Sequence, residues 1–377
     1  IGTLRQTITF QECVFKAGAT ISYKESMYKV SFVDCIFESL VFVKCTSASN
    51  LAIGGNFEKG IEINAGRFEI LTITGIDSYS ENKLSGRLCI DGAGVEGKLN
   101  VRNLNTQEIE ISGHISKNSE INIDNCSACV LKMVDIVNEG KMRFLRFNTQ
   151  NKFLSTLISI DNCNLGKTEF ISANLNVMDS FLFKNSFILD SLFVNVKWPR
   201  LKPKFKSKVM SLTDHKDFFR QIKYNLGKQG DAISEHNFHA LEMHALRLES
   251  LQQLIKLRKR SYPWIENFQN ACVLQLSSWS SYFGLSWIRP IAFFLVLNSL
   301  VFSIMVSKGW VDGIYFSWDN SFGAMLNTFP DMLYNANPLR RLKENYTDNE
   351  ILYDILMRSI TSYCIYNFVR ATRRYVK

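Results

Sequence analysis

Short, self-similar segments that alternate apolar and polar residues fill the first 198 residues. TITFQECVF (7–15) returns 22 residues later as KVSFVDCIF (29–37), and EINIDNCSA (120–128) returns 37 residues later as LISIDNCNL (157–165). Alternation over such short runs, with Asn, Gly, Asp and Ser between them, predicts β-strands. Repetition at about 20 residues per unit is typical of a solenoid, in which each coil buries its apolar face against the next.

The repeat tightens toward the end of this region. Large apolar residues then recur every five or six positions, at Phe170, Leu175, Phe181, Phe187 and Leu192. Together with the A-N-L unit at 173–175, residues 165–196 resemble pentapeptide-repeat proteins, and this resemblance implies a right-handed β-helix over residues 1–198. Trp198-Pro199 is expected to end the helix, because proline cannot donate to a further strand. A β-sandwich is the alternative fold.

Aspartates and cysteines recur beside these strands. We interpret most of the nine cysteines as unpaired core residues, as expected in a reducing compartment, rather than as a disulfide framework. Cys126 and Cys129 are weak candidates for a metal or redox pair, because no second pair accompanies them. β-Helices also occur in carbohydrate enzymes, and Asp34, Asp124 and Asp161 could line up as a carboxylate cluster. We favour turn residues that close each coil, and we predict no enzyme activity.

The positive charge of the chain is concentrated in its middle. Residues 197–262 contain 15 Lys and Arg against 6 Asp and Glu, whereas residues 1–196 contain 19 against 21 and residues 263–377 contain 10 against 8. Apolar residues at three- and four-residue steps predict helices near 213–226 and 231–255. We therefore expect a basic helical linker over 199–262. Its first cationic run is the predicted site for an anionic ligand: Lys197, Arg200, Lys202, Lys204, Lys206 and Lys208.

Two features of the linker resemble ligand-binding motifs but lack the spacing that those motifs need. Gly227-Lys228-Gln229-Gly230 lacks the spacing and the terminal Lys-Ser/Thr of a phosphate-binding loop. His236, His239 and His244 spread over about 140° of a helix surface, too wide for one metal ion. We predict no cofactor and no metal.

The region 263–377 has the pattern of a membrane domain. Residues 291–306 contain no charged side chain, and with their flanks they give a predicted span over about 288–307. A buried core helix is the alternative. A second predicted span, 351–369, is less apolar and carries polar residues that would face a water-filled interior. The predicted pore-lining residues are Asp354, Arg358, Thr361 and Ser362.

Basic residues flank both predicted spans. Under the positive-inside rule they place both chain termini in the cytoplasm and the protein in a bacterial inner membrane. The residues expected at the membrane interface are Arg258, Lys259, Arg260, Arg289, Arg373 and Arg374.

The order of these parts resembles a known domain plan. The plan consists of a β-helix, then DFFRQIKYNLGKQGDAISEHNFHALEMHALR (217–247), FGLSWIRP (283–290) and SITSYCIYNFVRATRRYVK (359–377). It is similar to bacterial pentapeptide-repeat-like membrane proteins whose C-terminal halves look like two-helix ion channels. It also resembles channel effectors of antiphage systems such as Hailong. No potassium-channel filter motif separates the spans, so potassium selectivity is not implied.

Three functions follow as expectations. The first is an oligomeric membrane channel, a tetramer by analogy, because two helices per chain cannot enclose a pore. Single-stranded DNA or a nucleotide, sensed by the cytoplasmic part, would gate it. The second is a membrane-anchored binding or scaffold protein without conductance, in which Asp354 and Arg358 simply pair with each other. The third is a secreted carbohydrate enzyme, which the free cysteines disfavour.

Overall fold

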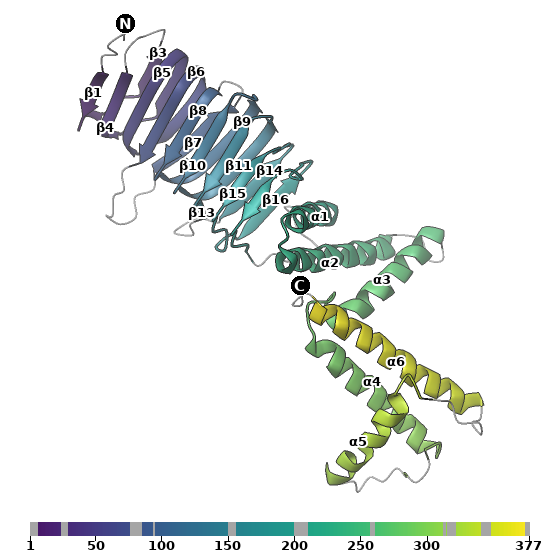
Figure 1. Ribbon diagram of the computed structural model, residues 1–377. Coiled ribbons are helices and arrows are strands. Elements are labelled where there is room, and N and C mark those ends of the chain that lie inside the picture. The colour runs from purple at the N-terminus through teal and green to yellow at the C-terminus, as the bar shows by residue number, and fades with distance from the viewer. Residues whose placement is uncertain are drawn as a thin grey trace. The chain divides into compact units, whose positions relative to one another are not determined.

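The computed structural model describes residues 7–23, 29–75, 85–92, 95–149, 156–199, 210–256, 261–311, 314, 322–340 and 348–373. The chain forms two compact units, Ile1–Asp231 and Ala232–Lys377 (Figure 1). The first unit contains the strands and one helix, and the second contains only helices in its described part.

The first unit is a parallel β-solenoid (Figure 1). Each strand pairs in parallel with the strand that occupies the same place in the next coil. The parallel pairing confirms the solenoid and excludes the β-sandwich alternative, which requires mainly antiparallel strands. Its strands are β1 (Thr7–Gln11), β2 (Val14–Phe15), β3 (Ala19–Tyr23), β4 (Lys29–Phe37), β5 (Val41–Phe57), β6 (Gly60–Gly75), β7 (Ser85–Asp91), β8 (Val95–Arg102), β9 (Asn105–Ile115), β10 (Glu120–Asp124), β11 (Ser127–Asn138), β12 (Lys141–Leu145), β13 (Asn148–Thr149), β14 (Leu157–Asp161), β15 (Thr168–Ile171), β16 (Ser180–Lys184) and β17 (Leu192–Val194).

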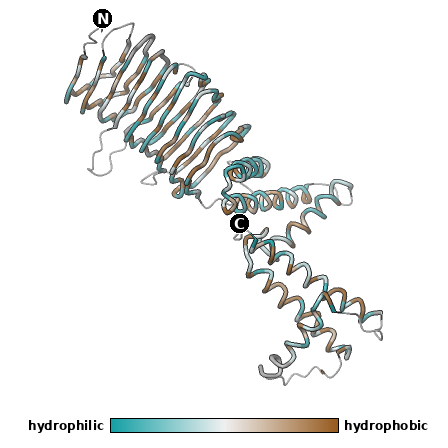
Figure 2. Tube along the Cα trace, viewed as in Figure 1, coloured by the Kyte–Doolittle hydropathy of each residue, from teal (hydrophilic) through white to brown (hydrophobic). Residues whose placement is uncertain are grey.

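Successive coils pair in the same register, so side chains of the same kind stack along the solenoid axis. Val101 pairs with Ile123, Ile123 with Phe144, Phe144 with Phe170, and Phe170 with Phe193. The rings of Phe144 and Phe170 stack with centroids 4.8 Å apart and nearly parallel planes. Apolar residues therefore recur in every coil and form one continuous interior (Figure 2).

The corners of the coils are residues with left-handed backbone conformation. One row runs through Asn103, Asn125, Arg146, Ser172 and Asn195, all with φ between 46° and 58°. The backbone amide of each of the first four donates to the carbonyl of the residue just before the next corner. Asn and Asp tolerate this conformation better than other non-glycine residues, which explains why they recur beside the strands.

Helix α1 (Leu212–Lys228) closes the C-terminal end of the solenoid (Figure 1). Ser211 and Asp214 form a capping box at its start. Its apolar face, with Phe218 and Ile222, is buried, and the Phe181 and Phe218 rings lie 4.3 Å apart. The polar side chains at the edge of this face replace the hydrogen bonds that a further coil would make.

Three amide side chains at four-residue steps make those bonds. Gln221 accepts from the amide of Ile188 and donates to the carbonyl of Ser186, at 2.8 and 3.0 Å. Asn225 donates to the carbonyl of Ile188, and Gln229 accepts from the amide of Phe193. The last bridge of the solenoid joins Asn174 to Lys197. The solenoid thus ends just before Trp198-Pro199, and the helix supplies the physical cap.

The second unit contains α2 (Ala232–Lys256), α3 (Tyr262–Ser281), α4 (Ile288–Ser307), α5 (Phe322–Ala336) and α6 (Asp348–Arg373). Helix α2 packs on α3, and α4 packs on α6. An apolar cluster joins the C-terminal half of α4 to α5 and α6 through Phe302, Met305, Met332 and Met357. The region between the two predicted spans includes helix α5, which contains Pro330.

Candidate functional site

Helix α4 is the one helix in the described residues that is long and apolar enough to cross a membrane. Its mean hydropathy is 2.1, and only 33% of it is buried within the protein. A core helix of a soluble protein would be mostly buried. Helix α6, which covers the predicted second span, is not apolar enough by the same measure, so the two-helix membrane region stays a prediction.

Asp354, a predicted pore-lining residue, is completely buried at the centre of an ionic cluster. It forms ion pairs with Arg340 and, at 2.7 Å, with Arg358. Arg358 also donates to the carbonyl oxygen of Arg340. Arg340 donates to the Asn335 side chain at 2.6 Å and lies over the Tyr334 ring, which ties the α5–α6 connection to α6. Arg340 is not among the predicted pore-lining residues, because an arginine in a connecting segment carries no periodic signal.

The other two predicted pore-lining residues lie on different sides of α6. Thr361 is buried, accepts a hydrogen bond from the Asn298 side chain of α4 and donates to the carbonyl of Met357. Ser362, one residue later, is exposed. A step of one residue turns a helix by about 100°, so the structure brings Asp354, Arg358 and Thr361 to the inward side of the protomer and leaves Ser362 outside.

The predicted anionic-ligand run is described at one position only. Lys197 is exposed, and its backbone amide donates to the carbonyl of Ala173, which fixes it on the last coil of the solenoid. The remainder of the run lies outside the described residues: Arg200, Lys202, Lys204, Lys206 and Lys208.

Two of the predicted membrane-interface residues are described. The Arg289 guanidinium lies over the Tyr282 ring and donates to the carbonyl of Ser278, near the start of α4. Arg373 is exposed in the last turn of α6. Arg258, Lys259, Arg260 and Arg374 lie outside the described residues.

The described residues do not bring together the side chains that a metal site or a carboxylate cluster would need. No group of three His, Cys, Asp or Glu side chains there could hold a metal ion. Burial raises the pKa of the Cys126 thiol to about 12, so the metal-binding thiolate is disfavoured. Asp34, Asp124 and Asp161 do not occupy equivalent positions in the coils: Asp34 is itself a corner residue, whereas Asp124 and Asp161 each lie one residue before a corner, at Asn125 and Asn162.

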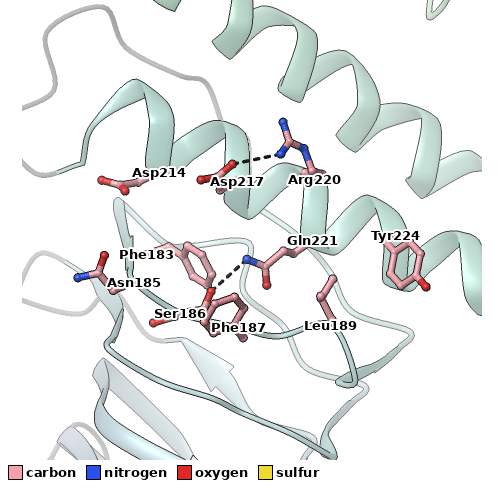
Figure 3. Close-up of a pocket in the computed structure, with 10 residues that line it drawn as sticks. All are labelled: Phe183, Asn185, Ser186, Phe187, Leu189, Asp214, Asp217, Arg220, Gln221 and Tyr224. Atoms are coloured by element: carbon pink, nitrogen blue, oxygen red, sulfur yellow. Dashed lines mark hydrogen bonds and ion pairs between the residues drawn. The ribbon is translucent and has the colours of Figure 1, made fainter.

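A groove that the sequence analysis missed lies between α1 and the loop that follows β16 (Figure 3). Its volume is about 530 Å³, within the usual range for small-ligand sites. Phe183, Phe187 and Leu189 supply apolar surface, and Phe187 is 61% exposed. Its polar residues are Asn185, Ser186, Asp214, Asp217, Arg220, Gln221 and Tyr224. The groove is formed by residues from two distant segments, which sequence periodicity could not bring together.

The charges along this groove differ from those of the basic run. Asp217 pairs with Arg220 at 3.5 Å, and Asp214 adds a second carboxylate (Figure 3). The groove therefore suits an apolar group with hydrogen-bond donors rather than a polyanion.

No protein-family model, characterised protein or solved structure gives a significant match to this chain. The parallel solenoid is consistent with the resemblance to pentapeptide-repeat proteins. The resemblance to channel effectors of antiphage systems gains no support from these comparisons.

Proposed function

We propose that the chain is one subunit of an oligomeric channel in a bacterial inner membrane, with the solenoid as a cytoplasmic sensor. The observation that carries the proposal is the mainly exposed, strongly apolar helix α4. Exposing such a helix to water is unfavourable, whereas lipid stabilises it. We further propose α6 as the second span, since it packs along α4 and its outward residues Leu352, Ile355 and Val369 are apolar.

The buried polar residues of the helical unit support a conducting function. Ionisable groups inside membrane domains are costly and commonly mark ion pathways. The Asn298–Thr361 pair joins α4 to α6, and the Arg340–Asp354–Arg358 cluster joins α6 to Arg340, which follows α5. A pore between several subunits, four by analogy, would need these groups or the outward Ser362 to contact water.

The proposed signal is an anion, single-stranded DNA or a nucleotide, bound by the basic run 197–208. The excess of basic residues in this segment supports an anionic partner. Binding there would act on the end of the solenoid, because Lys197 is hydrogen-bonded to the last coil.

Three measurements test the proposal. The mass of the particle in detergent should correspond to three or more chains, and the same particle in liposomes should conduct ions. A monomer would contradict the channel. Val296→Glu, which places a charge on the exposed side of α4, should abolish membrane insertion, whereas Val296→Leu should not.

A non-conducting membrane anchor is the second candidate. The observation that favours it is the ion pair between Asp354 and Arg358 within one chain, the arrangement expected if these residues are only structural. A stable oligomer without conductance under any tested ligand would support this candidate over the channel.

A further inference from the structure

The outer face of α3 carries a stripe of large apolar side chains. The stripe consists of residues at three- and four-residue steps: Tyr262, Ile265, Phe268, Cys272, Leu276 and Trp279. Each is exposed, from 41% for Leu276 to 82% for Tyr262 among those with a measured fraction. Spacing of this kind places all six on one side of the helix.

The opposite face of α3 packs inward and carries Leu274 among smaller and polar residues. Ala271 and Ser278 are buried, and α3 packs against α2. Arg247 of α2 donates to the side chains of Gln275 and Ser278, at 3.2 and 3.0 Å. Helix α3 thus exposes a stripe of large apolar side chains that a surface helix of a soluble protein would normally bury.

We propose that the outer stripe of α3 lies in the headgroup layer of an anionic bilayer, so that α3 is an interfacial helix. This inference rests on the proposed membrane location of α4. Helix α4 begins at Ile288, only seven residues after α3 ends, so α3 directly precedes the proposed span in the chain. Trp and Tyr, both present in the stripe, favour the membrane–water interface.

Charge points to anionic lipid as the partner. Four basic residues precede α3 in the sequence, and Arg289 follows it: Lys256, Arg258, Lys259, Arg260 and Arg289. Basic residues beside an apolar helix face strengthen binding to anionic headgroups. Helix α3 itself is not a candidate span, because it contains too many polar residues.

The native Cys272 lies within the stripe and can carry a nitroxide label in the full-length chain. The background variant replaces Cys13, Cys45 and Cys89 with serine, so that the native thiols that remain besides Cys272 are buried. Ile265→Cys supplies a second stripe position. Asn270→Cys is the matched control, because Asn270 is exposed and lies about 200° around the helix from Cys272. Collision of the label with oxygen and with a water-soluble nickel chelate is measured in vesicles that contain phosphatidylglycerol.

The proposal expects labels at positions 265 and 272 to favour oxygen over the nickel chelate severalfold, and the label at 270 to show the reverse. Equal access of the nickel chelate to positions 270 and 272 would overturn it. Protection of position 272 from both reagents would also overturn it, because a second copy of the chain would then cover the stripe. A label at Val296→Cys on α4 tests the membrane location of α4 separately from that of α3. If position 296 is in lipid and position 272 is in water, the proposal for α3 fails while the proposed span α4 stands.

Discussion

The side chain of Asn298 donates a hydrogen bond to the hydroxyl of Thr361 over 3.2 Å, and both residues are buried between α4 and α6. The Asn298 Oδ1 atom has no hydrogen-bond partner among the described residues. The pair therefore joins the proposed first span to the polar helix at one point, while leaving an acceptor that a water molecule or another donor could use.

Thr361→Val should weaken the α4–α6 contact. The substitution keeps the shape of the side chain but removes the acceptor of the Asn298 amide, at a cost of about 1 kcal/mol for an interhelical hydrogen bond in a membrane protein. Unfolding of the full-length protein in mixed detergent micelles measures the loss. Ser303→Ala is the control, because its exposed hydroxyl bonds only to the carbonyl of Ser299 in its own helix. Equal losses in the two variants would contradict the assignment.

Asp354→Asn should destabilise the protein more than Arg358→Gln does. Removal of the carboxylate leaves two buried guanidinium groups without their shared counterion, which costs roughly 3–5 kcal/mol. Removal of Arg358 leaves Asp354 paired with Arg340, so the loss should be smaller. The same detergent titration compares the two variants, and the reverse order would show that Arg340 does not hold Asp354.

Loss of the α1 amides should open the end of the solenoid. In Gln221→Ala and Gln229→Ala, the backbone amides of Ile188 and Phe193 lose their acceptors and should exchange with deuterium faster. Mass spectrometry of peptides that cover 186–194 measures this exchange. Asp190→Ala, an exposed change in the same loop, should leave it unaltered. Unchanged exchange in both glutamine variants would mean that the helix caps the coil by apolar packing alone.

The solenoid could be predicted from the sequence because each coil repeats the same local pattern. TITFQECVF, which forms β1 and β2, pairs in register with KVSFVDCIF, which forms β4, so sequence self-similarity maps directly onto spatial neighbours. The corner position of Asp34 follows from the same repeat. Asp34 is not equivalent to Asp124, because the corner residue is the one directly before the cysteine. That residue is Asp34 before Cys35, but it is Asn125, not Asp124, before Cys126.

The parts that could not be predicted depend on contacts between distant segments. Gln221, Asn225 and Gln229 have the spacing of an exposed polar helix face, and only the open edge of the last coil makes them caps. Arg340 becomes part of the Asp354 cluster through a tertiary contact with α6. The stripe on α3 was not predicted, and its exposure could not follow from residue spacing, because an apolar stripe ordinarily indicates the buried side of a helix.

Arg358→Ala should raise the permeability of cations relative to anions if the channel proposal holds. Guanidinium groups repeated around a shared pore repel cations, and their removal lowers that barrier. Reversal potentials in salt gradients across planar bilayers report the change. Leu352→Ala is the control, because Leu352 is apolar and 63% exposed. Unaltered selectivity in Arg358→Ala, with conductance retained, would place the pore elsewhere and favour a purely structural role for the Asp354–Arg358 pair.

Replacement of Lys202, Lys204, Lys206 and Lys208 with Glu should abolish binding of short single-stranded DNA to the full-length oligomer. In the wild type, four lysines that neutralise four phosphates give a slope of about −3 when the logarithm of the association constant is plotted against the logarithm of salt concentration. Fluorescence anisotropy of labelled oligonucleotides measures both quantities. The control replaces four exposed solenoid lysines, Lys16, Lys117, Lys141 and Lys167, with Glu, which changes the net charge equally. If both variants lose binding alike, the attraction comes from overall charge and the 197–208 run is not a specific site; if the wild type never binds, the signal is not single-stranded DNA.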